Sequence, residues 1–178
     1  MPPAKKAAKK RPSHSAHHPH EGKDLRRAFE HTARVDILRR SLSPSAAEPI
    51  SALVALASEE LASDRDQEAA ELLRASEHLS FAALAAAPVE APLTPELQHA
   101  LEEQFQELRR KADEHWQRKQ RGLLASIYSG ACEAAQRAFS RRAWHQALEF
   151  ARAAEALSRV TIDEAPGLPE GRKRLRAA

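Results

Sequence analysis

The sequence predicts an all-α fold of about six helices, arranged as helical hairpins in a bundle or a short right-handed array. Apolar residues recur at spacings of three and four through most of the chain, which is the period of one helix face. Only 5 of the 178 residues are glycine, and β-branched residues are few, which disfavours a sheet. Alanine supplies much of the 42% apolar content and aromatic residues only 4%, so we expect a thin core of closely stacked helices.

Composition divides the chain into three parts. They are a disordered basic tail rich in Lys and His at 1–22, an all-helical domain at 23–163, and a basic C-terminal tail at 164–178. The N-terminal tail lacks an apolar period and cannot bury enough surface to offset the entropy of ordering it. Within the helical domain, prolines concentrate at 85–95 and separate two halves, 23–87 and 95–163, each with three expected helices.

We expect the first half to bury one apolar stripe from each helix. The first helix runs from about Lys23 to Ser41. The residues expected to face the core from this helix are Leu25, Phe29, Ala33, Ile37 and Leu38. Those of the second helix are Ile50, Leu53, Val54, Ala57 and Leu61, and those of the third are Ala69, Leu72, Leu73, Leu79, Ala83 and Leu84.

The fourth helix has the clearest start signal, with Thr94 as N-cap, Pro95 in the first turn and Glu96 near the positive end of the helix dipole. It runs to about Gln120. Its expected inward residues are Leu97, Leu101, Phe105, Leu108, Ala112 and Trp116. Gly122 leaves open whether residues 95–140 form one helix or two.

A fifth helix over 123–140 and a sixth over 142–160 are expected to fold back on each other at Ser140-Arg141-Arg142. Alanines recur on the facing stripes, so the two axes can approach closely, with Phe139, Trp144 and Phe150 filling the edges. The charged residues of the sixth helix are expected to stay in water and form weak pairs. These are Glu149, Arg152, Glu155 and Arg159.

This hairpin, over about 123–160, resembles a tetratricopeptide-repeat hairpin. Ala135 stands where that family has a small residue in its first helix, Trp144 at the aromatic opening of the second helix, and Ala147 and Ala154 at its two small positions. A fainter match covers 50–87, where the corresponding residues are Ala57, Ala69, Leu73 and Ser76. The sequence departs from the family pattern at Ala151, which replaces a larger packing residue, and it has no proline closing the unit. The resemblance implies a helical array that binds other proteins.

The basic pI of about 9.2 is a property of the ends rather than of the body, because residues 24–167 hold 18 basic and 23 acidic residues. Cys132 is the only cysteine, so an intrachain disulfide is excluded and a reducing, cytoplasmic location is expected. Its place on an alanine-rich face favours an inert thiol. No apolar run has the length needed to cross a bilayer, so no membrane association is expected.

Candidate catalytic and metal-binding patterns are weak. Histidines of the N-terminal tail (His14, His17, His18 and His20) could hold a metal only adventitiously, and Glu96-x-x-His99 lacks the second pair that a di-iron site needs. Arg26-x-x-x-x-His31 resembles the Arg-x4–6-His pattern of HEPN-type ribonucleases, which would make a nuclease the most distant alternative. Neither a Gly-rich phosphate loop nor a Gly-x-Ser-x-Gly elbow is present. We therefore expect no enzyme activity, no cofactor and no metal.

The leading hypothesis is a non-enzymatic interaction or scaffold module whose paired helices present a groove to a partner protein or peptide. The candidate groove residues are Tyr128, Trp144, His145 and Phe150. The alternative is a nucleic-acid-associated protein whose basic tails contact phosphates in a salt-dependent way. The candidate phosphate contacts are Lys5, Lys6, Lys9, Lys10, Arg11, Arg172, Lys173, Arg174 and Arg176. The oligomeric state is left open.

Overall fold

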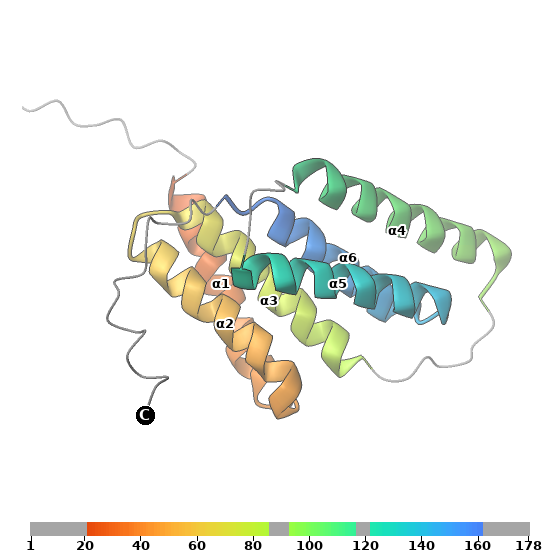
Figure 1. Cartoon of the computed structure of the whole chain (residues 1–178), viewed down its shortest axis with the longest axis horizontal. Helices are drawn as coiled ribbons and strands as arrows, with labels where there is room; N and C mark the ends of the chain where they lie inside the picture. Colours follow the sequence, from red (N-terminus) through yellow and green to blue (C-terminus); the bar gives the residue numbers. More distant parts are fainter. Residues whose placement is uncertain (1–20, 86–92, 117–121, 162–178) are drawn as a thin grey trace, which may run out of the picture.

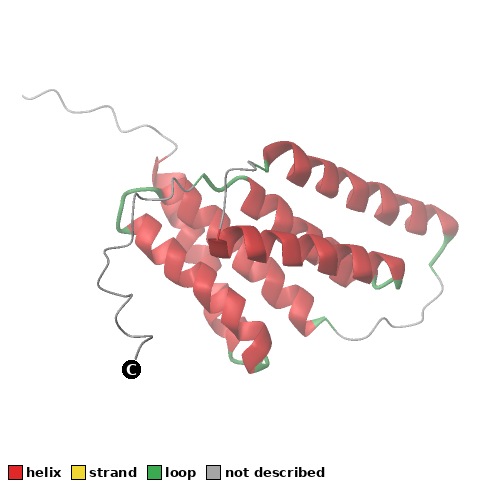
Figure 2. Ribbon diagram, viewed as in Figure 1, coloured by secondary structure: helices red, strands yellow, loops and turns green. Residues whose placement is uncertain are grey.

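The computed structural model describes residues 21–85, 93–116 and 122–161, and these residues form six helices and no strand (Figures 1 and 2). The helices are α1 (Glu21–Arg39), α2 (Pro44–Leu61), α3 (Asp66–Leu84), α4 (Pro95–His115), α5 (Gly122–Ser140) and α6 (Trp144–Ser158). The predicted all-α class with six helices is confirmed. The predicted tails lie outside the described residues, except that Glu21 and Gly22, predicted in the N-terminal tail, belong to α1. Most of the proline-rich segment also lies outside the described residues.

Two central helices, α3 and α6, organise the packing. In the first half, α1 and α2 both pack against α3, and in the second half α4 and α5 both pack against α6. The two central helices then pack against each other, so the halves share a core rather than standing apart. Figure 1 shows α6 flanked by α4 and α5. Most side chains of α6 are consequently buried, from Ala147 through Ser158 with the exception of the half-buried Phe150 and Arg152.

The two halves repeat one three-helix unit. The turns before α3 and α6 each contain a residue with a left-handed backbone, Asp64 (φ 57°) and Arg142 (φ 60°). The next residue in each turn donates its N–H to a carbonyl five residues back, at 3.0 Å in the first turn and 2.9 Å in the second. Asp64 and Arg142 are 78 positions apart (142 − 64), and the same separation relates seven pairs of identical residues in the two central helices. They are Ala69 and Ala147, Glu71 and Glu149, Arg74 and Arg152, Ala75 and Ala153, Glu77 and Glu155, Leu79 and Leu157, and Ser80 and Ser158.

The central helices run antiparallel. Near one end Gln146 donates a hydrogen bond to the carbonyl of Ala82 at 3.0 Å, and further along Arg74 meets Glu155 at 2.6 Å. This register places Ala75 opposite Ala153, and both are fully buried. Because these two positions correspond to each other in the repeat, the halves are related by an approximate two-fold axis that passes between two methyl groups. Small side chains at this point allow the two helix axes to approach closely.

The prediction of which face of α1 points toward the core is wrong. Ala28 and Val35 are buried, whereas Phe29 is 62% exposed and Ile37 is 67% exposed. The face of α1 that points inward also carries a polar residue, His31, whose ring forms a hydrogen bond with the Glu77 carboxylate on α3. The most apolar stripe of α1 is therefore not the stripe that this fold buries.

Smaller corrections concern the helix ends. Leu97 and Leu84, expected in the core, are 48% and 37% exposed. Residues 95–140 contain two helices, because α4 ends at His115 and α5 begins at Gly122, whose φ of +71° suits glycine. The predicted turn at Ser140-Arg141-Arg142 is present, and the alanines of α5 and α6 face each other as expected.

Enlarging the side chain at the two-fold axis should separate the central helices. We expect Ala153→Leu to lower the free energy of unfolding by about 1–3 kcal/mol, because a larger side chain has no space opposite Ala75. Urea denaturation followed by circular dichroism measures the loss. The exposed Ala55→Leu serves as the control and should change stability by less than about 0.5 kcal/mol; an equal loss in both variants would contradict the close crossing.

Candidate functional site

The four candidate groove residues do not meet in one place. Tyr128 is buried and stacks on Trp116, with ring centroids 3.7 Å apart, and its hydroxyl donates to Asp113 at 3.4 Å. Trp144 lies at the start of α6 and meets the ring of Phe139 edge-on. The other two diverge further, since Phe150 packs against the core while His145 is exposed. Three of the four thus contribute to packing.

The remaining sequence candidates are also separated or lie outside the described residues. Arg26 pairs with Glu30 on the outer surface of α1, while His31 turns inward, so the structure does not bring the two ribonuclease-like residues together. Glu96 and His99 are exposed at the start of α4. The lysines and arginines proposed to contact nucleic acid, and the four N-terminal histidines, lie outside the described residues.

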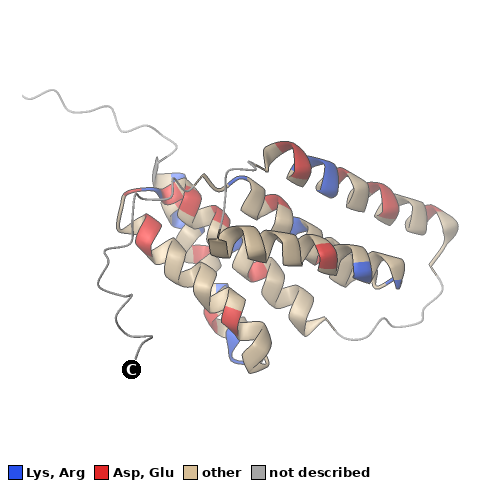
Figure 3. Ribbon diagram, in the orientation of Figure 1, with Lys and Arg blue, Asp and Glu red and all other residues tan. Residues whose placement is uncertain are grey.

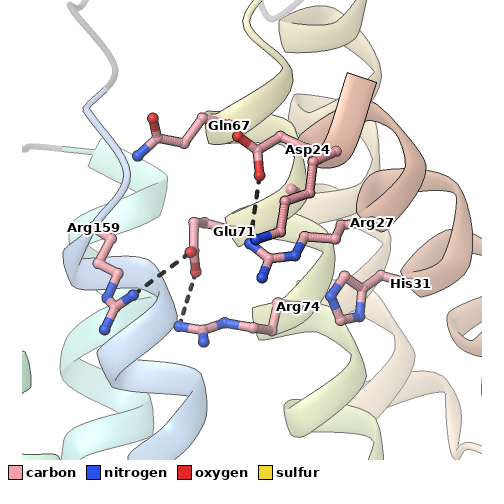
Figure 4. Close-up of a pocket in the computed structure, with 9 residues that line it drawn as sticks. Asp24, Arg27, His31, Gln67, Glu71, Arg74 and Arg159 are labelled. Carbon is pink, nitrogen blue, oxygen red and sulfur yellow. Dashed lines mark hydrogen bonds and ion pairs between the residues drawn. The ribbon is translucent and has the colours of Figure 1, made fainter. Parts of the chain in front are cut away.

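The structure instead reveals a charged cleft between α1, α3 and the C-terminal end of α6 (Figure 4). Its volume is about 550 Å³. We refer to it as the cationic cleft. The residues that line it are Lys23, Asp24, Arg27, His31, Gln67, Ala70, Glu71, Arg74 and Arg159. Four of them are lysine or arginine and two are acidic, and they come from helices far apart in the sequence.

A network of ion pairs holds the arginines in the cleft. Arg74 contacts Glu71 at 2.8 Å and Glu155 at 2.6 Å, so it links α3 to α6. Arg159 lies 4.0 Å from Glu71 and also pairs with Glu155. On the opposite wall, Arg27 pairs with Asp24 at 3.4 Å, and its side chain is 53% exposed. Figure 4 shows the side chains of Arg27, Arg74 and Arg159 directed toward the same space.

Glu71 at the centre of this network is poorly stabilised as an anion. Burial raises its pKa, and the charges of Arg74 and Arg159 only partly offset that effect, so the pKa stays above its ordinary value of 4.5. Glu71 is therefore a weaker partner for these arginines than its position suggests. The lining holds four lysine or arginine side chains and only two carboxylates, so the cleft presents an excess of positive charge to an anion arriving from solvent.

His31, which lines the cleft, contacts a second buried carboxylate, that of Glu77. The Nδ1 of His31 lies 2.6 Å from an oxygen of Glu77, and Arg34 approaches the same carboxylate at 3.4 Å. Burial acts to raise the pKa of Glu77, but the hydrogen bond to His31 and the charges of His31 and Arg34 outweigh it and lower the pKa. His31 is thus fixed against α3 and cannot swing freely into the cleft.

A comparable pair joins the two halves outside the cleft. His78 on α3 lies 2.7 Å from Glu149 on α6, which also pairs with Arg152. Burial acts to raise the pKa of Glu149, but His78 and Arg152 hold it below its ordinary value. Glu149 and Glu155 are only 4% and 5% exposed, so their predicted place in water is wrong. The reason is that the fold places α6 between other helices, which the periodicity of one helix could not reveal.

The repeat shows which cleft residues the scaffold itself does not need. The buried positions Ala28 and Val35 of α1 match Phe105 and Ala112 of α4, which fixes the alignment of these helices. The first-half residues Lys23, Arg27 and His31 correspond to Ala100, Gln104 and Leu108 of the second half. In the other direction, Arg159 of the second half corresponds to Phe81 of the first. By contrast, Glu71 and Arg74 recur as Glu149 and Arg152. The Glu71–Arg74 pair is therefore common to both halves, whereas Lys23, Arg27 and Arg159 are found only at the cleft.

Sequence reasoning missed the cleft because its cations are widely spaced and each lies in an ordinary charged helix. The signal that could have found it is the comparison of the two halves. Among the described residues, no group of three or more histidine, cysteine or acidic side chains is arranged to hold a metal ion. The chemistry that the arrangement offers is electrostatic binding of an anion by guanidinium and ammonium groups.

Comparison with known proteins found no matching family model, no similar curated protein and no similar solved structure. In the described part of the chain, the helices lack a stretch long and apolar enough to traverse a lipid bilayer. The geometry of the cleft is consequently the main basis for a functional proposal.

Two equivalent glutamates should respond oppositely to substitution. Because the folded-state pKa of Glu149 is lowered, its carboxylate stabilises the fold above about pH 4.5, and this contribution disappears as the pH falls through the folded-state pKa. We expect Glu149→Gln to cost about 1.5–3 kcal/mol at pH 7 and much less at pH 3. Chemical denaturation at the two pH values measures the difference.

The matched variant is Glu71→Gln. Since the pKa of Glu71 is raised, its ionised form costs stability at pH 7, and that cost vanishes as the pH falls through the raised pKa. We expect Glu71→Gln to leave stability at pH 7 unchanged or to increase it. A loss at pH 7 as large as that of Glu149→Gln would show that both carboxylates have the same role.

Proposed function

We propose that the protein is a non-enzymatic interaction module that binds an acidic segment of a partner protein in the cationic cleft. The observation that carries this proposal is the meeting of Arg27, Arg74 and Arg159 at one cleft, from three helices that are distant in sequence. A guanidinium group presents paired donors that match a carboxylate, and its charge persists at any physiological pH. Side-chain carboxylates of aspartate or glutamate therefore suit the cleft.

A peptide fits the cleft better than a nucleic acid. Asp24 and Glu71 lie among the cations, and these carboxylates would repel a continuous phosphate backbone while tolerating the spaced charges and amide groups of a peptide. Figure 3 shows acidic residues interspersed with basic ones along the helices. Binding of nucleic acid through the terminal lysines and arginines stays a prediction of the sequence and is the second outcome of the test below.

A scaffold role, a cytoplasmic location and the tetratricopeptide-like resemblance belong to this proposal and rest on the sequence pattern. Catalysis is not part of it, because the guanidinium groups that dominate the lining stay charged and attract a ligand rather than transfer protons.

The proposal is tested by fluorescence anisotropy of the full chain with a fluorescein-labelled hexaglutamate peptide at low salt. We expect saturable binding that weakens about threefold to tenfold in the double variant Arg27→Gln/Arg159→Gln, which removes two charge-assisted contacts from partly exposed side chains. A hexalysine peptide should not bind.

The matched control is Arg137→Gln/Arg142→Gln, which removes the same charge from the exposed end of the other half. We expect it to bind hexaglutamate like the unmodified chain. Equal weakening by both double variants would indicate a general charge effect and contradict the cleft. A single-stranded oligonucleotide that binds more tightly than the peptide would favour the nucleic-acid alternative.

A further inference from the structure

An apolar stripe of α1 faces solvent. Leu25 is 37% exposed, Phe29 is 62% exposed and Ile37 is 67% exposed, and Ala33 between them is also exposed. These four residues, which we name the α1 ridge, follow one another at intervals of four along the helix and so form one continuous ridge on its surface. Large apolar side chains gathered in this way on a soluble helix mark an interaction surface more often than chance exposure does.

The second half provides an internal comparison for this surface. The α4 positions equivalent to the α1 ridge hold only polar residues, which are Glu102, Gln106, Arg110 and Glu114. There Arg110 pairs with Glu107 at 2.8 Å and with Glu114, and hydrogen bonds from Arg110 and Lys111 lower the pKa of Glu107 to about 2. The equivalent surface of the second three-helix unit is thus formed by polar and charged residues. The apolar α1 ridge must therefore serve a purpose other than holding this chain together.

We propose that the α1 ridge binds the α1 ridge of a second copy of this chain, in an antiparallel arrangement. Ridges with four-residue spacing pack into the grooves of an identical surface at a crossing angle of about −50°. Charge complementarity supports the same occupant. Glu30 and Arg34 flank the ridge on one side, one turn apart, and their side chains are 53% and 55% exposed. In an antiparallel pair, Glu30 of each copy lies opposite Arg34 of the other.

The size of the surface determines how strong this association is. Only Leu25, Phe29 and Ile37 contribute large apolar area, which is less than the roughly 800 Å² per partner of a standard interface. The dimer is accordingly weak and reversible. The cationic cleft uses the adjoining face of α1, through Lys23 and Arg27, so that dimerisation leaves both clefts open and doubles the number of sites in one assembly.

Sedimentation velocity of the full chain, from about 10 µM to about 1 mM, tests the proposal. We expect a concentration-dependent shift from monomer to dimer, and no shift in Phe29→Glu or Ile37→Glu. Each substitution acts on both copies and should weaken the dimer more than tenfold, because a charge replaces buried apolar area. Since both residues are exposed, their thermal melting should match that of the unmodified chain.

The matched control is Gln106→Glu at the equivalent position of α4, which should dimerise normally. A charge change at Glu30 then tests the antiparallel pairing: Glu30→Arg should weaken the dimer because it places an arginine opposite Arg34 of the other copy, and Glu30→Ala should weaken it less. Arg34 is left unchanged because it also pairs with the buried Glu77. A chain that stays monomeric over the whole concentration range would overturn the proposal. So would a dimer that survives both Phe29→Glu and Ile37→Glu.

Discussion

The antiparallel contact between α3 and α6 is the constraint on which the rest of the structure depends. Each outer helix packs against one of these two, so the position of all four follows from theirs. Two features fix the contact: alanines at the crossing point and ion pairs on either side of it. Buried ion pairs are costly to desolvate, and breaking one leaves an uncompensated charge. They therefore select one register of the two helices more than they add to overall stability.

Part of this arrangement could be read from the sequence. The class, the approximate helix boundaries and the alanine-lined pairing of α5 with α6 follow from periodicity and from the N-cap at Thr94, which accepts a hydrogen bond from the backbone of Leu97. These are local properties, and one helix is enough to show them. The residues that carry the predicted resemblance in 50–87 and 123–160, among them Ala57 and Ala135, are spaced like Asp64 and Arg142 of the two turns.

What the sequence could not supply is the identity of each helix's neighbours. Glu149 looks like a surface residue in its own helix, and its burial depends on His78 from the other half as well as on Arg152 of the same helix. Phe29 looks like a core residue for the converse reason, since its helix packs through Ala28 and Val35 instead. The cationic cleft likewise depends on which helices are neighbours. Residues of three helices line it, so the sequence of any one helix does not reveal it.

The separation of α3 and α6 along the chain also governs how the protein is completed during synthesis. When the first half leaves the ribosome, Arg74 and His78 have no carboxylates from α6, and the alanine face of α3 is still uncovered. Their partners on α6, Glu155 and Glu149, are synthesised only after more than sixty further residues. Long-range contacts of this kind delay folding relative to local helix formation. The nascent first half consequently exposes the face of α3 that α6 later covers, and α6 completes the core of the described residues.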